Sequence, residues 1–571
     1  MNNRSSALTT AATLAAIAGC ALAIGSMMGA DYETALPPEF FISHLPVDFN
    51  TFGGGFPKGT IEDGAVYAWL TFVAINWPAK HGKRGMQDGS VPLNAPADAR
   101  VWETYRARVE VYPGTGRPFD DFQRADDYGF DAPPRYIYNP ARVGTYPGLP
   151  PGEVPACPGT TPSGSIPLHN LDEPDHNNVR SGLSPKEPFP GQQILLESKA
   201  NRQEYVYVAS RGWYGDQPIA PAKKRTGEYV RANLNTPPPA KMDDPNDTEF
   251  VSFPVHTVEI KAAWRRLGPL DDPSQFLVSR VRYYKTVNDK PCYVDSSLTD
   301  PKDRWGLVAM HITHKTPSAP YFTWATFEHV SSLVTQDLGP DGKPIPVENP
   351  EGSYSEAGNK IKAAYTPNLQ IVPATLETPQ RYVKDSAALS NEPQYGLYFH
   401  PKAGVGVTDV KYVRINRRIN EIPKIIVDIN RAAQTSLLKL APNLPLRYYR
   451  LISTQWVPLD KKPGVVYEGP QARGVYYASN VIIEGPPANQ MFSGQFVDGV
   501  TQMSDYVNRA VPALNPKPNP GAPVFLNAFF NGKGYLAGGC MGCHGSRQAY
   551  GTDWSFLLDR QRVMEPEINP E

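Results

Sequence analysis

The chain has 571 residues, of which 40% are hydrophobic and 11% aromatic, a composition typical of a globular protein with a large core. Its 56 basic and 57 acidic side chains give a formal net charge of −1, which argues against a nucleic-acid partner held by phosphate contacts. The 60 prolines and 47 glycines favour long ordered loops and short strands over a helical bundle.

Residues 1–30 are typical of an export signal, with one charge at Arg4 followed by an uncharged, alanine-rich run. Three outcomes stay open: cleavage after Ala23, acylation of Cys20, or retention as a membrane anchor. Each places the rest of the chain in the periplasm or on the outer face of a bacterial membrane. Membrane association through the N-terminus is therefore left open.

The middle of the chain predicts mainly strands. Residues 63–80 are expected to form a buried helix that is capped by Asp63 and ended by Pro78, and 422–440 a second helix. Residues 98–112 begin as a helix and end like a strand, whereas 113–200 resemble long loops. The strand candidates are 204–210, 256–264, 276–284, 305–316, 446–457 and 475–485.

These elements predict an α+β fold. We expect one large, mainly β unit over 31–535, with a few helices and long proline-rich loops. A C-terminal tail, 536–571, is expected to pack back onto this unit.

Two cysteines, Cys157 and Cys292, lie outside both the export segment and the tail. In an oxidising compartment they are expected to pair, and a bridge closing so long a loop stabilises a protein by about 3–5 kcal/mol. The alternative is two unpaired buried thiols.

The tail contains the most specific motif. Cys540, Cys543 and His544 spell Cys-x-x-Cys-His, the attachment sequence of haem c. A thioredoxin-like dithiol normally opens a helix near the start of a domain, and a structural zinc site needs a second ligand pair. Neither rival fits a motif at the end of a chain that has no other cysteine pair of this kind.

The residue types fit one covalent haem c. Each cysteine forms a thioether to a vinyl group, and His544 supplies the proximal nitrogen to the iron. Arg547 is either a partner of a haem propionate or a solvated surface arginine. Trp554, Phe556 and Leu557 either cover a haem edge or anchor the tail; these three residues follow the motif in "DWSFLL".

Only 27 residues follow His544, too few for an independent cytochrome fold, and the proline-rich stretch 513–523 excludes helical walls before it. The upstream unit must therefore supply the distal side of the haem. Residues 305–330 predict a hairpin with three histidines. If Thr316 lies opposite Tyr321, His311 shares a face with Trp324, Thr326 and Glu328.

In that register His314 and His329 lie on the other face, with Val308, Met310, Ile312 and Phe327. His311 is the first choice as distal ligand because Glu328 lies diagonally across from it and could orient its ring. His314 and His329 are the other distal candidates, and for each of the three a structural role is the alternative. Met310, Met491 and Met564 are alternative sixth ligands, while His256 and His400 are expected to be structural.

Several segments resemble one family in order and wording: "TFVAINWPA", "VWETY", "WGLVAMHITHKT…WATFEHV", "YYRLISTQWV" and "CMGCHG…DWSFLL". The chain is similar to exported bacterial proteins generally labelled only cytochrome c family protein, each with one C-terminal haem motif. The resemblance spans about residues 60 to 560. It implies haem c binding and electron transfer, and it carries roles only for Cys540, Cys543 and His544.

Three functions are therefore considered. The first is an exported c-type cytochrome that exchanges electrons with a redox partner protein or with a small-molecule donor or acceptor. The second is a haem enzyme with an open distal site that acts on peroxide, dioxygen or another small ligand. The third is a haem-bearing envelope component without catalytic activity.

Overall fold

The computed structural model describes residues 41–49, 60–117, 127–173, 194–232, 271–330, 422–456 and 539–558, with most of 241–268, residues 563–568 and several short strands elsewhere. Its centre is a seven-stranded sheet in the order β1-β4-β5-β9-β10-β16, in which β6 pairs with β9. All the described strand pairings within this sheet are antiparallel. The strands are β1 (Arg106–Ala107), β4 (Leu195–Ala200), β5 (Val258–Arg266), β6 (Val278–Ser279), β9 (Trp305–Thr316), β10 (Ala319–His329) and β16 (Tyr449–Gln455).

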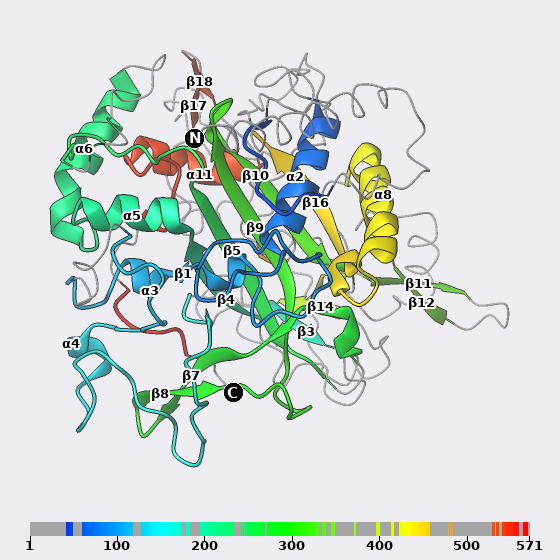
Figure 1. The fold of residues 1–571 in the computed structure, drawn as a ribbon, viewed down its shortest axis with the longest axis horizontal. Coiled ribbons are helices and arrows are strands. Elements are labelled where there is room, and N and C mark those ends of the chain that lie inside the picture. The colour runs from blue at the N-terminus through cyan, green and yellow to red at the C-terminus, as the bar shows by residue number, and fades with distance from the viewer. Residues whose placement is uncertain are drawn as a thin grey trace, which may run out of the picture.

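Helices cover both faces of this sheet (Figure 1). Helices α2 (Ile61–Ile75) and α8 (Lys424–Leu440) pack on one face and form the largest hydrophobic core with it. Helices α5 (Arg202–Ser210), α6 (Asp216–Ala232) and α11 (Gly539–Ala549) belong to a second core on the other face. Two single-turn helices, α3 (Arg108–Val111) and α4 (Pro140–Val143), lie in the connections.

Smaller sheets surround the central one. A three-stranded sheet has the order β2-β7-β8, with β2 (His169–Asn170), β7 (Val281–Val287) and β8 (Lys290–Asp295). The other short strands are β3 (Val179–Gly182), β11 (Val334–Leu338), β12 (Pro344–Glu348), β13 (Ile371–Val372), β14 (Gly396–Phe399), β15 (Val413–Ile415), β17 (Ala528–Phe530) and β18 (Lys533–Tyr535). The expected α+β, mainly β architecture is confirmed, and the tail helix α11 does pack back onto the large unit.

The expected disulfide is present. Cys157 and Cys292 are bridged, with their Cα atoms 4.9 Å apart, and the bridge fastens a long loop to strand β8. The same loop pairs with this strand through its backbone, because Cys157 N–H donates to the carbonyl of Tyr293 at 2.9 Å.

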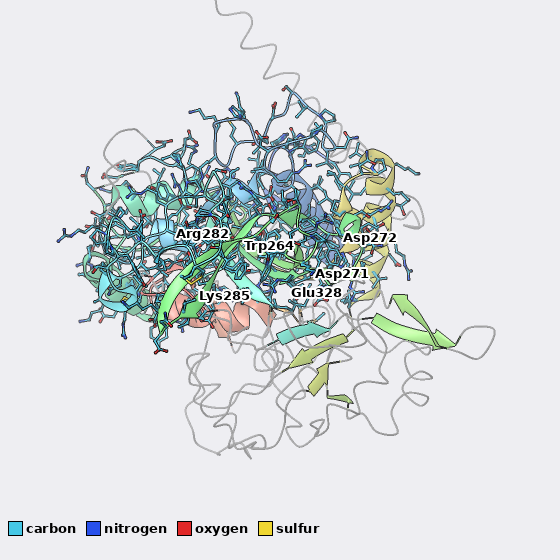
Figure 2. The ribbon with its side chains drawn as sticks, turned by 90° about the horizontal axis from the view of Figure 1, so that it is seen from below. Trp264, Asp271, Asp272, Arg282, Lys285 and Glu328 are labelled. Atoms are coloured by element: carbon cyan, nitrogen blue, oxygen red, sulfur yellow. A yellow bond between two sulfur atoms is a disulfide. The ribbon has the colours of Figure 1, made fainter. Side chains whose placement is uncertain are left out.

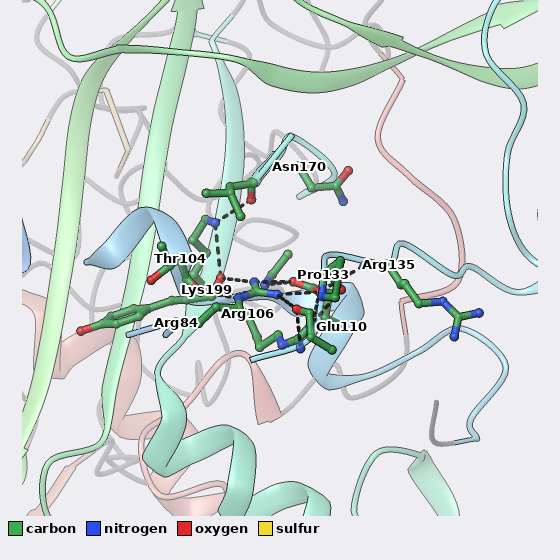
Figure 3. A network of polar contacts seen from close by, with 12 residues as sticks. Arg84, Thr104, Arg106, Glu110, Pro133, Arg135, Asn170 and Lys199 are labelled. Atoms are coloured by element: carbon green, nitrogen blue, oxygen red, sulfur yellow. Dashed lines mark hydrogen bonds and ion pairs between the residues drawn. The ribbon is translucent and has the colours of Figure 1, made fainter. Parts of the chain in front are cut away.

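A buried ionic network closes the β1 edge of the sheet. Arg84 and Arg106 converge on the fully buried carboxylate of Glu110 (Figure 3). The Glu110 oxygens also accept the backbone N–H groups of Ala107 and Arg135, at 3.0 and 3.2 Å. Burial raises the pKa of Glu110, but the two guanidinium groups outweigh it and lower the pKa to about 2.

The N-cap of helix α2 lies three residues earlier than expected. Thr60 is its N-cap: Asp63 N–H donates to the Thr60 hydroxyl at 3.1 Å, and the Asp63 carboxylate accepts Thr60 N–H at 2.7 Å. Asp63 therefore completes a capping box and is not the cap itself. The helix ends at Ile75, before Pro78 as expected.

Two other local predictions were wrong. Residues 204–210 form helix α5, because Asn201 caps its first turn and the packing of Tyr205 and Val208 in the second core outweighs their strand propensity. Residues 98–112 contain a 3-10 turn, the short β1 and then α3, so the helix follows the strand.

The prediction for 305–316 is confirmed by β9, and those for 256–264 and 422–440 by β5 and α8, whose ends are shifted by no more than two residues. Other local predictions were partly right. Strand 276–284 is interrupted at Arg280, strand β4 lies inside the expected loop 113–200, and residues 445–448 form a 3-10 turn before β16. Most of 475–485 lies outside the described residues, as do Met491, His400 and the export segment 1–30.

Candidate functional site

The hairpin β9–β10 gives the central sheet one apolar and one polar face. Its body has the predicted register, with His314 opposite Thr323 and His311 opposite Thr326. Nearer the turn the register shifts, so that Thr316 pairs with Ala319 and not with Tyr321. Met310, Ile312 and Phe327 lie in the core beneath α2 and α8, so His311 and Trp324 face the opposite side.

Two rows of side chains cross the polar face. The first row consists of Ala200, Glu259, Thr313, Trp324 and Gln455, on β4, β5, β9, β10 and β16. The second row consists of Ser198, Lys261, His311, Thr326 and Ser453 on the same strands. Neighbours within a row are direct cross-strand partners, so their side chains lie close together.

The tail lies across the first row. Met541 N–H donates to the side-chain oxygen of Gln455 at 2.9 Å, and the rings of Trp324 and His544 have centroids 4.2 Å apart. Trp554 and Leu557 are buried in the second core. They therefore anchor the tail, as one of the two sequence interpretations proposed.

Helix α11 places the motif on one side of a helix. Cys540 and His544 are four residues apart and Cys543 lies between them, so all three share a face of α11. Cys540 is buried and His544 is half-buried. The side chain of Cys543 lies outside the described residues.

The hydrogen bond of His544 fixes its tautomer. Its Nδ1 lies 2.8 Å from the carbonyl oxygen of Trp554, and a carbonyl only accepts, so Nδ1 carries the proton. Nε2 is then the basic nitrogen. The pKa of His544 is lowered to about 3, chiefly by burial, with smaller contributions in the same direction from His311, Lys261 and Arg547. The neutral ring is the form that binds a metal.

The loop that supplies this carbonyl has an unusual backbone. Gly551, Asp553 and Trp554 have φ values of +82°, +48° and +74°. Left-handed conformations are costly for residues with a side chain, so contacts must hold them. The Asp553 carboxylate accepts Phe253 N–H at 2.7 Å and the Lys315 ammonium at 2.6 Å. Lys315 thus ties the loop to β9.

Gly551 packs directly against the backbone of α6. A Cβ atom there would lie 1.9 Å from the carbonyl oxygen of Lys223 and 2.9 Å from Gly227 N. Only glycine allows the backbone at residue 551 to come this close to the backbone of α6.

The predicted distal residues separate into two groups. His311 lies on the polar face beside Lys261, on the side where α11 packs. His314 faces α2, with Nδ1 2.6 Å from the Tyr67 hydroxyl. His329 donates from Nε2 to the Gln275 carbonyl at 2.9 Å and stacks on Phe276.

The other predicted site residues have defined places. Glu328 is ion-paired with Arg450 at 3.9 Å, and it lies toward the same end of the sheet as Asp271 (Figure 2). Met310 is buried in the α2 core, and the Met564 sulfur accepts a hydrogen bond from Asn139 at 3.6 Å. Arg547 is buried over the rings of Tyr550 and Phe556.

The donor set fits a covalently attached haem. The half-buried His544 offers a neutral Nε2, and its Nδ1–H donates to a backbone carbonyl. Two aromatic rings contact the imidazole. The ring of Phe556 lies edge-on to it with centroids 4.5 Å apart, and the ring of Trp324 is tilted against it. Cys540, Cys543 and His544 would hold the group, while Trp324 and Phe556 would contribute apolar surface to its pocket.

Sequence reasoning missed several contacts of the tail. Lys261, Lys315 and Gln455 come from strands far from residue 540 in the chain, and ordinary strand alternation gives no sign that they face the tail. Asp553 precedes a predicted aromatic anchor, but its left-handed backbone has no sequence signal apart from the nearby Gly551.

Within the described ranges, no three His, Cys, Asp or Glu side chains gather as a metal-binding group. None of the helices in those ranges has both the length and the apolar character that a bilayer crossing needs. No protein-family model, curated protein or solved structure matches this chain.

Proposed function

We propose that the chain is an exported c-type cytochrome with one haem attached at Cys540 and Cys543. The observation that carries the proposal is the hydrogen bond from His544 Nδ1 to the Trp554 carbonyl at 2.8 Å, within a Cys-x-x-Cys-His helix. This bond orients the imidazole and leaves Nε2 as the proximal ligand of the iron.

Haem supplies a one-electron redox couple when bound, and the chain's own residues determine its surroundings. Lys315 and Asp553 hold the loop that positions His544, and the aromatic rings of Trp324 and Phe556 exclude water from the imidazole. The electron donor or acceptor is a redox partner protein or a small molecule in the periplasm.

Among the three histidines of the hairpin, we assign the distal side to His311. It alone lies on the face beneath the tail, whereas His314 and His329 are held by Tyr67 and Gln275. Lys261, its partner on β5, adds positive charge beside it.

The test is an absorption spectrum of the purified protein, oxidised, reduced and with carbon monoxide. A haem c spectrum is expected, and His311→Ala should alter it. His314→Ala is the matched control, because it removes a histidine from the same strand but from the opposite face. A preparation from maturation-competent cells without a haem spectrum would overturn the proposal, and carbon monoxide binding to the wild type would favour a haem enzyme with an open distal site.

A further inference from the structure

Two buried carboxyl groups meet beneath the tail. Glu204 of α5 and Glu259 of β5 have exposed fractions of 0% and 8%. Among the described residues, no donor reaches either oxygen of Glu204 or Oε1 of Glu259. The two groups are close enough to share a hydrogen bond with each other.

Such a pair must hold a proton. Two adjacent buried carboxylates cannot both be charged, and a buried carboxylate without a donor is costly. Burial, followed by the neighbouring carboxylate, raises the pKa of Glu204 far above its usual range. Burial is also the main reason that the pKa of Glu259 rises to about 7. At neutral pH Glu204 is therefore protonated and donates to Glu259.

A third polar group faces the pair. The Tyr112 hydroxyl is fully buried and has no hydrogen-bond partner among the described residues. After burial, the charges of Glu204 and Glu259 are the largest influences on its pKa, and they raise it. The Tyr112 hydroxyl and the carboxyl pair therefore form one buried polar cluster.

Other charged groups around the pair come from every neighbouring element. Arg108 comes from α3, Glu173 from the loop after β2, Asp553 from the tail, and Lys315 from β9. Asp553 is neutralised by Lys315 at 2.6 Å. Within the part of the chain that the structure describes, no cation is ion-paired with Glu204 or Glu259, so a bound proton reduces the charge of this pair.

The pair contacts the loop that positions His544. The Ser555 hydroxyl hydrogen-bonds to the Glu259 carboxylate. Ser555 follows Trp554, whose carbonyl accepts the proton of His544 Nδ1. One peptide unit thus joins the carboxyl pair to the hydrogen bond of the proximal histidine.

We propose that Glu204 and Glu259 form the proton-accepting site of a proton-coupled electron transfer at this haem. In the oxidised protein the pair holds one proton and one negative charge. When the haem gains an electron from its redox partner, the pair binds a second proton from solvent, so the local charge stays constant. Oxidation returns the electron to an acceptor and releases that proton. This inference rests on the proposed function.

The test is the haem midpoint potential, measured by optical redox titration from pH 5 to 9. For the wild type we expect the midpoint potential to fall as pH rises through the neutral range. Reduction takes up a proton, and it becomes less favourable as the proton concentration falls. Glu204→Gln and Glu259→Gln should each lose this dependence. Asp172→Asn is the matched control, since Asp172 is a buried carboxyl with a pKa of about 7 that hydrogen-bonds to Tyr138, and it should retain the dependence.

A second measurement keeps the inference separate from the haem assignment. The redox difference infrared spectrum of the wild type should gain a band of a protonated carboxylic acid on reduction. This measurement uses the wild type alone, so it does not depend on whether a variant folds. If haem is present but the potential is independent of pH and no such band appears, the inference fails while the proposed function stands. If no haem is present, both fail.

Discussion

Replacing Gly551 with alanine should detach the tail from the large unit. At φ +82°, a residue with a side chain costs about 1–2 kcal/mol. The added methyl group would also lie 1.9 Å from the Lys223 carbonyl oxygen, and overpacking of this kind costs about 1–3 kcal/mol. The two costs together should weaken the packing of the tail against α6 by about 2–5 kcal/mol.

Hydrogen–deuterium exchange of the peptide 540–558, followed by mass spectrometry, measures this loss. If the tail opens as a unit, 2–5 kcal/mol corresponds to exchange faster by roughly 30-fold to several thousand-fold. Gly82→Ala is the matched control, because Gly82 has φ +69° and no described atom lies within 4 Å of its Cβ position. The reasoning is refuted if Gly551→Ala exchanges in this peptide no faster than Gly82→Ala.

Three further predictions concern the scaffold. Replacing Cys157 and Cys292 together with alanine should lower the free energy of unfolding by about 5 kcal/mol, since the bridge spans 135 residues; an unchanged denaturation midpoint would contradict this. Glu110→Gln should lose about 3–5 kcal/mol, because it leaves two buried guanidinium groups without their carboxylate. The wild-type Glu110 has a pKa lowered from 4.5 to about 2, so its stabilisation of about 3 kcal/mol is complete above pH 4.5 and is lost as pH falls through 2; acid titration of the variant should lack this loss. Asp553→Asn should destabilise the tail by about 3 kcal/mol, measured by the same exchange experiment, because Lys315 stays buried without its anion; Lys315→Met in the same background should recover part of the loss.

The hairpin was the most predictable part of the fold. Alternation between polar and apolar residues in 305–330 predicted which histidine faces which side, and the register of its body was right. Side chains in a strand alternate between two faces, so a polar–apolar pattern over ten residues leaves little choice in which face each residue occupies. Near the turn the prediction failed, because Phe322 adopts a φ of +65° and a local irregularity shifts the pairing.

Tertiary packing determines the conformation of residues 204–210, which their own sequence does not predict correctly. The run of tyrosine and valine at 204–210 suggests a strand in isolation, but the cap at Asn201 and the second core make it a helix. That helix brings Glu204 to Glu259. Neither residue has a distinctive neighbour in the sequence, so the buried pair could not be predicted without the fold.

The Cys-x-x-Cys-His motif could be predicted from the sequence, but the residues that contact it could not. Spacing alone identifies Cys540, Cys543 and His544, and the disulfide was expected from the cysteine count together with the predicted export. The partner of His544 is a backbone carbonyl, which is the same atom in every residue, so only the three-dimensional structure identifies Trp554.

The intact mass of the mature protein from cells competent in cytochrome c maturation tests the central claim most directly. The account predicts the mass of one haem added to the chain, retained under denaturing conditions and lost in the double variant Cys540→Ala, Cys543→Ala. An unmodified mass for the wild type would contradict it.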